Sequence, residues 1–170
     1  MAGKFFIKEL IMEPEAYIKR LQEISAEKFN LVEKILNLTK AQTQSIAAED
    51  LNELENLVSG KQKLIDEISK LDDEFSDCFE ELKRKLNVKN LDELKGVNIP
   101  GADRLQGIIG SIMETVKEIC EIEKQNEAGV RKLMNAVGEE IRKINQAKKA
   151  NAAYMSKPVI SPSYFIDKKK

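Results

Sequence analysis

Apolar side chains recur at alternating steps of three and four residues along most of the chain, and this spacing constrains the fold more than any other feature. Such a repeat places apolar residues along one side of an α-helix. The most regular series is Leu51, Leu54, Val58, Ile65, Ile68, Phe75, Phe79, Leu82 and Leu86, and a second row of Leu57, Leu64, Leu71 and Cys78 runs beside it. A helix of this length spans about 55 Å, which is more than a compact globule of this size needs.

The same spacing predicts three long helices, near residues 14–48, 50–87 and 103–153. Glycine (8) and proline (4) are scarce and aromatic residues make up only 5%, which argues against a β-rich fold with frequent turns. We therefore predict an all-α fold, an elongated antiparallel bundle or coiled coil of three long helices with an extended C-terminal tail.

Local signals mark the predicted helix boundaries. Pro14 suits the first turn of a helix, where its missing N–H is no loss, and Asp50 and Asp103 are typical N-cap residues for the second and third helices. Asn90 is expected to cap a short turn between these two helices. Residues 98–101 contain proline and glycine and are a strong helix breaker.

Helical periodicity stops after Met155, because Pro158 and Pro162 are expected to keep residues 156–170 extended. This tail is nevertheless rich in large apolar side chains, which are costly to leave in water. We therefore expect it to dock on an apolar groove of its own bundle or of a neighbour. The residues that would dock are Val159, Ile160, Tyr164, Phe165 and Ile166.

The length of 170 residues suits a single domain. We divide it into an N-terminal segment (1–13), the bundle (14–155) and the tail (156–170). Charged residues interrupt the apolar clusters near the N-terminus, and no small-residue cleavage site follows them, so we expect no signal peptide. No apolar stretch approaches the ~18–20 residues that span a membrane, so the expected location is the cytoplasm, without membrane insertion.

The absence of histidine excludes His-based catalytic triads, His-type zinc sites and the Glu-x-x-His di-iron pattern of helical bundles. Cys78 and Cys120 are too far apart for a zinc ribbon and too few for a disulfide scaffold. A net charge of −1 and a pI of about 5.8 argue against nucleic-acid binding. Adjacent carboxylates such as Asp72 and Asp73 lack a nucleophile or an imidazole beside them. We expect no enzymatic activity, no metal and no cofactor.

Charge is unevenly distributed along the chain. Residues 50–81 contain eleven acidic and three basic side chains, a balance of −8, whereas residues 141–170 contain eight basic and one acidic, a balance of +7. The two regions could attract each other within the chain or face different partners, although solvated helix faces explain many such charges.

The run of residues 38–73 resembles the FlgN family, small helical export chaperones that hold hook-associated proteins before flagellar type III secretion. In that family, a short segment with acidic residues and a leucine follows the first helix, and residues 48–51 match it. A pattern of spaced leucines then follows, here from Leu54 to Leu64 with Gln62 within it. The acidic run 72–74 departs from the Glu/Arg cluster that often ends this helix in the family.

The C-terminal part carries further resemblance. Asn126 looks like the family's asparagine before its leucine-spaced final helix, and Tyr154 stands where a tyrosine closes that helix in many members. The ending at 164–170 is similar to the tails of Gram-positive relatives.

This resemblance implies that the C-terminal helix receives an apolar, helix-forming segment from the C-terminus of a hook–filament junction protein. It also implies contact with components of the export apparatus. The apolar series of this helix weakens at Glu123 and resumes at Val130, as expected of a stretch that awaits a partner. The candidate client-binding residues are Asn126, Val130, Leu133, Met134, Val137, Ile141, Ile144 and Tyr154.

Other functions fit the same pattern. A structural or adaptor coiled coil would homo-oligomerise through the same apolar rows, and a chaperone for a different client, such as the filament cap, shares the proposed class. An enzyme is the most distant alternative. The sequence leaves the oligomeric state open.

Overall fold

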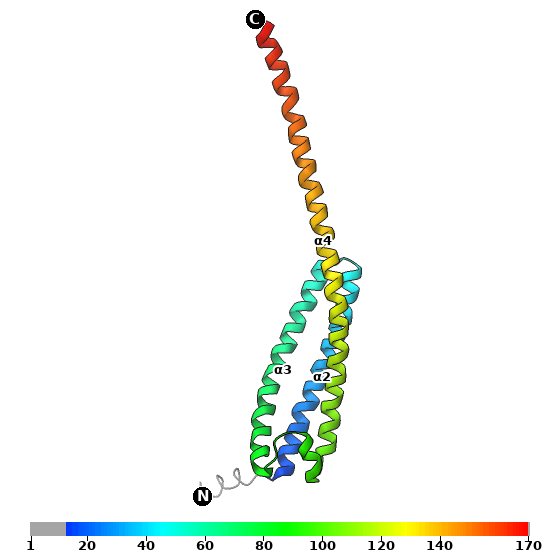
Figure 1. Ribbon diagram of the computed structural model, residues 1–170, viewed down its shortest axis with the longest axis vertical. Helices are drawn as coiled ribbons and strands as arrows, with labels where there is room; N and C mark the ends of the chain where they lie inside the picture. Colours follow the sequence, from blue (N-terminus) through cyan, green and yellow to red (C-terminus); the bar gives the residue numbers. More distant parts are fainter. Residues whose placement is uncertain (1–12, 170) are drawn as a thin grey trace. The chain divides into compact units, whose positions relative to one another are not determined.

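The computed structural model describes residues 13–169, with side chains as far as residue 155. Within this range there is no strand, and the all-α prediction is confirmed. The elements are α2 (Pro14–Ala47), α3 (Leu51–Leu86), a short 3-10 helix η1 (Asp92–Val97) and α4 (Ala102–Lys169) (Figure 1). The predicted N-terminal segment, residues 1–13, lies outside this range except for its last residue. None of the helices in the described range is both long enough and apolar enough to cross a membrane.

The chain forms two compact units, and the boundary between them falls within α4. The first unit extends to Asn126 and holds α2, α3, η1 and the beginning of α4. The second unit begins at Glu127 and consists of the rest of α4. Only the first unit therefore brings several helices together.

In the first unit, α3 runs antiparallel to α2. Tyr17, near the start of α2, pairs with Glu81 near the end of α3, and Gln42, near the end of α2, pairs with Lys61 towards the start of α3. The first part of α4 lies beside α2 and runs in the same direction (Figure 1). The three helices therefore alternate in direction along the chain.

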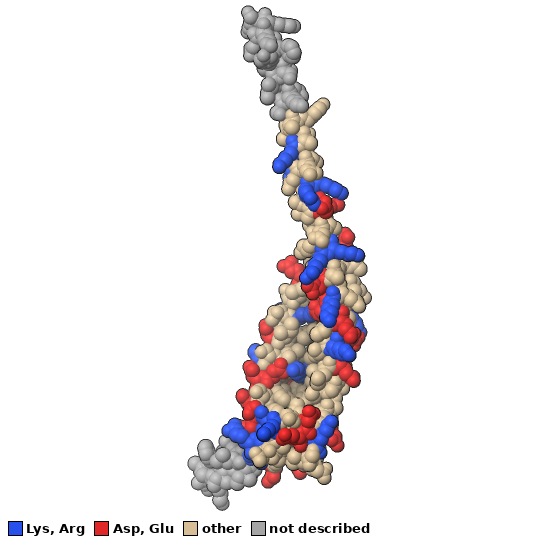
Figure 2. All heavy atoms as spheres, viewed as in Figure 1, with Lys and Arg blue, Asp and Glu red and all other residues tan. Residues whose placement is uncertain are grey.

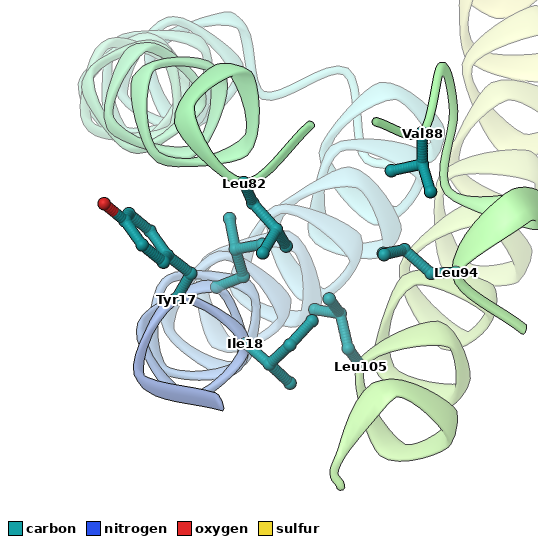
Figure 3. Close-up of a cluster of buried hydrophobic side chains, with 7 residues drawn as sticks. Tyr17, Ile18, Leu82, Val88, Leu94 and Leu105 are labelled. Carbon is teal, nitrogen blue, oxygen red and sulfur yellow. The ribbon is translucent and has the colours of Figure 1, made fainter. Parts of the chain in front are cut away.

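The core of the first unit is built on one face of α2. At one end of the unit, a cluster of buried side chains joins all its segments (Figure 3): Tyr17, Ile18 and Leu21 of α2, Leu82 of α3, Val88 and Leu94 of the connection, and Leu105 of α4. A second cluster, of Ile24, Leu31 and Leu71, continues between α2 and α3. Burying each such side chain is worth about 1.5–3 kcal/mol, so these clusters hold the helices together.

Both predicted rows of α3 contribute to the core. Leu57 and Leu71 of the second row are buried, and so is Leu82 of the more regular row. In the first half of α3, however, the members Val58 and Ile65 of the more regular row are 52% and 45% exposed. Part of that apolar row therefore remains on the surface of α3.

Three of the predicted boundary signals are confirmed. Pro14 occupies the first turn of α2. The side chain of Asp50 caps α3 by accepting a hydrogen bond from the backbone N–H of Glu53 at 3.0 Å. The side chain of Asn90 accepts one from the backbone N–H of Glu93, also at 3.0 Å, at the start of η1.

The fourth signal, an N-cap at Asp103, is wrong by two residues, because α4 begins at Ala102 and the residue before it is Gly101. Asp103 lies in the first turn of α4, where the positive end of the helix dipole stabilises a carboxylate. The turn before α4 depends instead on Gly101, whose φ is +89° and whose carbonyl accepts from the N–H of Leu105 at 3.0 Å. A Cβ at Gly101 would lie 2.5 Å from Nε2 of Gln22 and 3.2 Å from Cγ2 of Ile18.

The prediction of an extended C-terminal tail is wrong for the backbone, because α4 continues as a helix to Lys169. Proline fixes φ near −65°, which is itself a helical value. Pro158 and Pro162 therefore remove hydrogen bonds and crowd the preceding turn, which weakens a helix without forbidding it. The side chains of the predicted docking residues Val159, Ile160, Tyr164, Phe165 and Ile166 lie outside those that the structure describes, so their docking stays a prediction.

Replacing Gly101 with alanine tests the turn before α4. We expect Gly101→Ala to lower the free energy of unfolding by about 1–3 kcal/mol, because the positive φ disfavours a side chain and the new Cβ crowds Gln22. Gly107→Ala is the matched control, since its Cβ would meet nothing within 4 Å and should stabilise α4 by about 0.5–1 kcal/mol. Urea unfolding measures both changes. A Gly101→Ala chain as stable as the wild type would contradict this account.

Candidate functional site

The second unit carries an apolar row along α4. Met134, Ile141 and Ile144 are 58%, 53% and 52% exposed, and Val130 and Val137 are partly exposed. Their spacing places all five on one side of the helix. We call these five residues the α4 face. It presents only aliphatic and thioether groups, so it can bind another apolar surface.

Charged side chains flank the α4 face. Arg131 forms an exposed ion pair with Glu127 at 2.7 Å, one turn away, and Arg142 pairs with Glu139. Such pairs support a helix by a few tenths of a kcal/mol. Beyond Glu140 there is no acidic residue as far as residue 155, although four basic residues follow. The far half of the α4 face is therefore set in a basic surrounding.

Two other predicted client-binding residues of the second unit differ from the α4 face. Leu133 is only 8% exposed, so little of its surface is available to a partner. Tyr154 is 71% exposed and lies ten residues after Ile144, which puts it about a quarter turn around the helix from that residue. The structure therefore does not bring all the predicted residues onto one surface.

Asn126, also predicted as a client-binding residue, lies inside the first unit and is 6% exposed. Its side-chain amide donates a hydrogen bond to the backbone carbonyl of Thr39 at 3.1 Å. Its Oδ1 accepts one from the hydroxyl of Thr43 at 2.6 Å. Because both groups of the amide are used by α2, Asn126 ties α4 to α2 at this level.

Lys61 of α3 contacts α2 and α4 close to Asn126. Its side chain is 12% exposed, pairs with the carboxylate of Glu123 on α4 and donates to Oε1 of Gln42 on α2 at 3.0 Å. Burial lowers the pKa of the Lys61 ammonium below its usual value. We call Thr39, Gln42, Thr43, Lys61, Glu123 and Asn126 the polar layer. It joins all three helices immediately before the boundary between the two units.

The sequence analysis did not predict that the residues of the polar layer contact one another, although each interruption of an apolar series was visible. Lys61 interrupts the apolar series of α3, and Glu123 and Asn126 interrupt that of α4. Interruptions in different helices become partners only when the register of the helices is known, and the spacing within each helix does not fix that register.

Within the described part of the chain, no group of three His, Cys, Asp or Glu side chains could hold a metal ion. Cys78 is partly buried and Cys120 is exposed, and neither forms a disulfide. The exposed apolar row of the α4 face makes it the candidate docking surface.

A family model described as "FlgN protein" matches residues 12–158 of the chain. The match spans α2, α3, the polar layer and the α4 face. No curated protein and no solved structure matches.

Replacing Asn126 with alanine tests the polar layer. We expect Asn126→Ala to lower the free energy of unfolding by about 1–3 kcal/mol, because it leaves buried groups of α2 without their partner. Asn135→Ala, at an exposed asparagine of the same helix, should change it by less than about 0.5 kcal/mol. Urea unfolding of both variants gives the comparison. If both variants lost the same free energy of unfolding, the hydrogen bonds of Asn126 would not stabilise the fold.

Proposed function

The chain belongs to the FlgN family of flagellar export chaperones, and on this premise we propose that it binds hook-associated proteins of the hook–filament junction in the cytoplasm. Binding would keep these clients from assembling early and would deliver them to the type III export apparatus. The client segment would be a C-terminal, apolar, helix-forming stretch, bound in the helix-in-groove mode.

The exposure of the α4 face is the observation that carries this proposal. Met134, Ile141 and Ile144 each keep more than half of their surface in water, and they follow one another along one side of a helix. Fully burying such a side chain is worth about 1.5–3 kcal/mol, so covering the exposed half of each recovers a substantial part of that energy. A client helix laid along this row would do so.

The affinity must also allow release at the export apparatus. A dissociation constant between micromolar and nanomolar corresponds to about 8–12 kcal/mol. The few half-exposed side chains of the α4 face, together with the basic residues beside it, are compatible with the weaker end of this range, because association itself costs several kcal/mol.

We assign the predicted client-binding residues different parts in this proposal. The five residues of the α4 face contact the client. Tyr154 extends the contact on a neighbouring side of the helix, and its exposed ring is suited to an amphipathic partner. Asn126 and Leu133 are buried, so neither meets the client directly. Asn126 instead ties α4 to α2 through its two hydrogen bonds.

Paired substitutions on the α4 face test the proposal. We expect Ile141→Ser with Ile144→Ser to weaken binding of a peptide from the C-terminal helical segment of a hook-associated protein at least tenfold, which is about 1.4 kcal/mol. Both positions are exposed, so the fold should persist. Calorimetric titration into the full chain measures the affinity.

Met113→Ser is the matched control, because Met113 is 67% exposed on the same helix but lies in the first unit. It should leave client affinity unchanged. If the paired variant bound the peptide as tightly as the wild type, the client would bind at a surface other than the α4 face. Binding of filament-cap peptides, with no binding of hook-associated ones, would overturn the proposed client and leave the family assignment intact.

A further inference from the structure

A second apolar surface lies in the first unit, along the side of α3 that borders α4. Leu51, Val58 and Ile65 are spaced by seven residues and are 44%, 52% and 45% exposed. We call these three residues the α3 strip. On the viewed face of the first unit, the surface between α3 and α4 is largely uncharged, with acidic residues along α3 (Figure 2).

The ion pair between Lys61 and Glu123 shows which way the α3 strip faces. Val58 and Ile65 stand three residues before and four residues after Lys61, so they lie on the same side of α3 as the residue that reaches α4. On α4, Val116 stands two turns before Glu123 and is 41% exposed. Apolar residues of both helices therefore border the same strip of surface.

Acidic side chains line the outer edge of the α3 strip. Asp66 directly follows Ile65, and Glu55 stands three residues before Val58, which turns both about 60–100° further around the helix in the same direction. Both are exposed. A helix that covered the strip would therefore meet a row of carboxylates on one of its flanks.

The α4 face of the same sequence has the complementary pattern. Met134 and Ile141 are spaced by seven residues, as Val58 and Ile65 are. Arg131 and Arg142 are spaced by eleven, as Glu55 and Asp66 are, and they stand at the same offsets from their apolar neighbours: Arg131 three residues before Met134, and Arg142 one residue after Ile141. An apolar pair and a charged pair thus recur with equal spacing and opposite sign.

We propose that the α3 strip is the docking surface for the α4 face of a second copy of this chain, lying antiparallel to α3. In this orientation Met134 meets Ile65 and Ile141 meets Val58. Antiparallel helices place residues with equal offsets on the same side of their contact, so the two charged pairs also meet.

The charged contacts join Arg131 of one copy to Asp66 of the other, and Arg142 to Glu55. Within its own helix, each arginine already forms an exposed ion pair. Such a pair is worth only a few tenths of a kcal/mol, so giving it up for the contact with the second copy costs little. Each copy offers one strip and one face, so the contact joins two different surfaces and is heterologous.

Charge reversal on the two surfaces tests this contact in the full-length protein. One variant carries Glu55→Arg and Asp66→Arg, and the other carries Arg131→Glu and Arg142→Glu. We expect each variant alone to associate at least tenfold more weakly than the wild type, because like charges then face each other. Their equimolar mixture should regain association to within about threefold of the wild type, since both contacts again join opposite charges. Sedimentation velocity over a range of concentrations gives the dissociation constants.

A third variant, Glu114→Arg with Glu121→Arg, is the control. It changes the net charge by the same amount as the first variant, at exposed positions of α4 that lie away from the α3 strip. It should associate as the wild type does, and circular dichroism should show the same helix content in all chains.

Three results would overturn the proposal. A wild-type chain that stays monomeric at every concentration would show that no second copy binds the α3 strip. A mixture that fails to regain association, or a control that loses it equally, would show that the named charges do not form the contact. No client is present in these measurements, so their outcome is independent of the proposed chaperone activity.

Discussion

Burial of the apolar face of α2 is the interaction on which the first unit depends. Ile18, Leu21 and Ile24 are at most 2% exposed, and the segments that cover them come from α3, from the connection after it and from α4. Because α2 is covered from two sides, α3 and α4 are each covered mainly on one. The large hydrophobic side chains that remain exposed in the described residues accordingly lie on α3, on α4 and in the connection between them, and none lies on α2. The surfaces available to partners follow from this arrangement.

The sequence predicted the local features of the fold well, because local chemistry determines them. The start of α2 at Pro14, the cap at Asp50 and the cap at Asn90 each depend on a side chain and a backbone group a few residues apart. The end of α4 was predicted wrongly because proline was treated as a stop, although its φ suits a helix. Proline lowers the stability of a helix, but the prediction treated it as ending the helix.

Contacts between helices were harder to predict. Periodicity identified both rows of α3 but not which members of each row are buried: Leu57 and Leu82, from different rows, lie in the core, whereas Val58 is exposed. Asn126 was predicted as a client-binding residue from its place in the apolar series. The structure shows an amide that is already satisfied by Thr39 and Thr43. A polar interruption in an apolar series is thus equally consistent with a binding site and with a buried contact, and only the register of the helices distinguishes them.

The two proposals share residues. Met134 and Ile141 belong to the surface that would hold a client and to the surface that would meet a second copy. A single helix face cannot be covered twice, so client binding and self-association would exclude each other. The polar layer limits this competition to the helix beyond Asn126, because the part of α4 before it is tied to α2 and α3.

The environment of Tyr17 gives the protein an optical reporter of its own. The chain has three tyrosines and no tryptophan. The hydroxyl of Tyr17 donates to the Glu81 carboxylate at 3.0 Å, and burial together with this hydrogen bond raises its pKa above the ordinary value. Separation of α2 from α3 would remove both influences. Near-ultraviolet absorbance in mild alkali would then register the parting of these two helices without any attached label, because the freed phenol ionises at a lower pH.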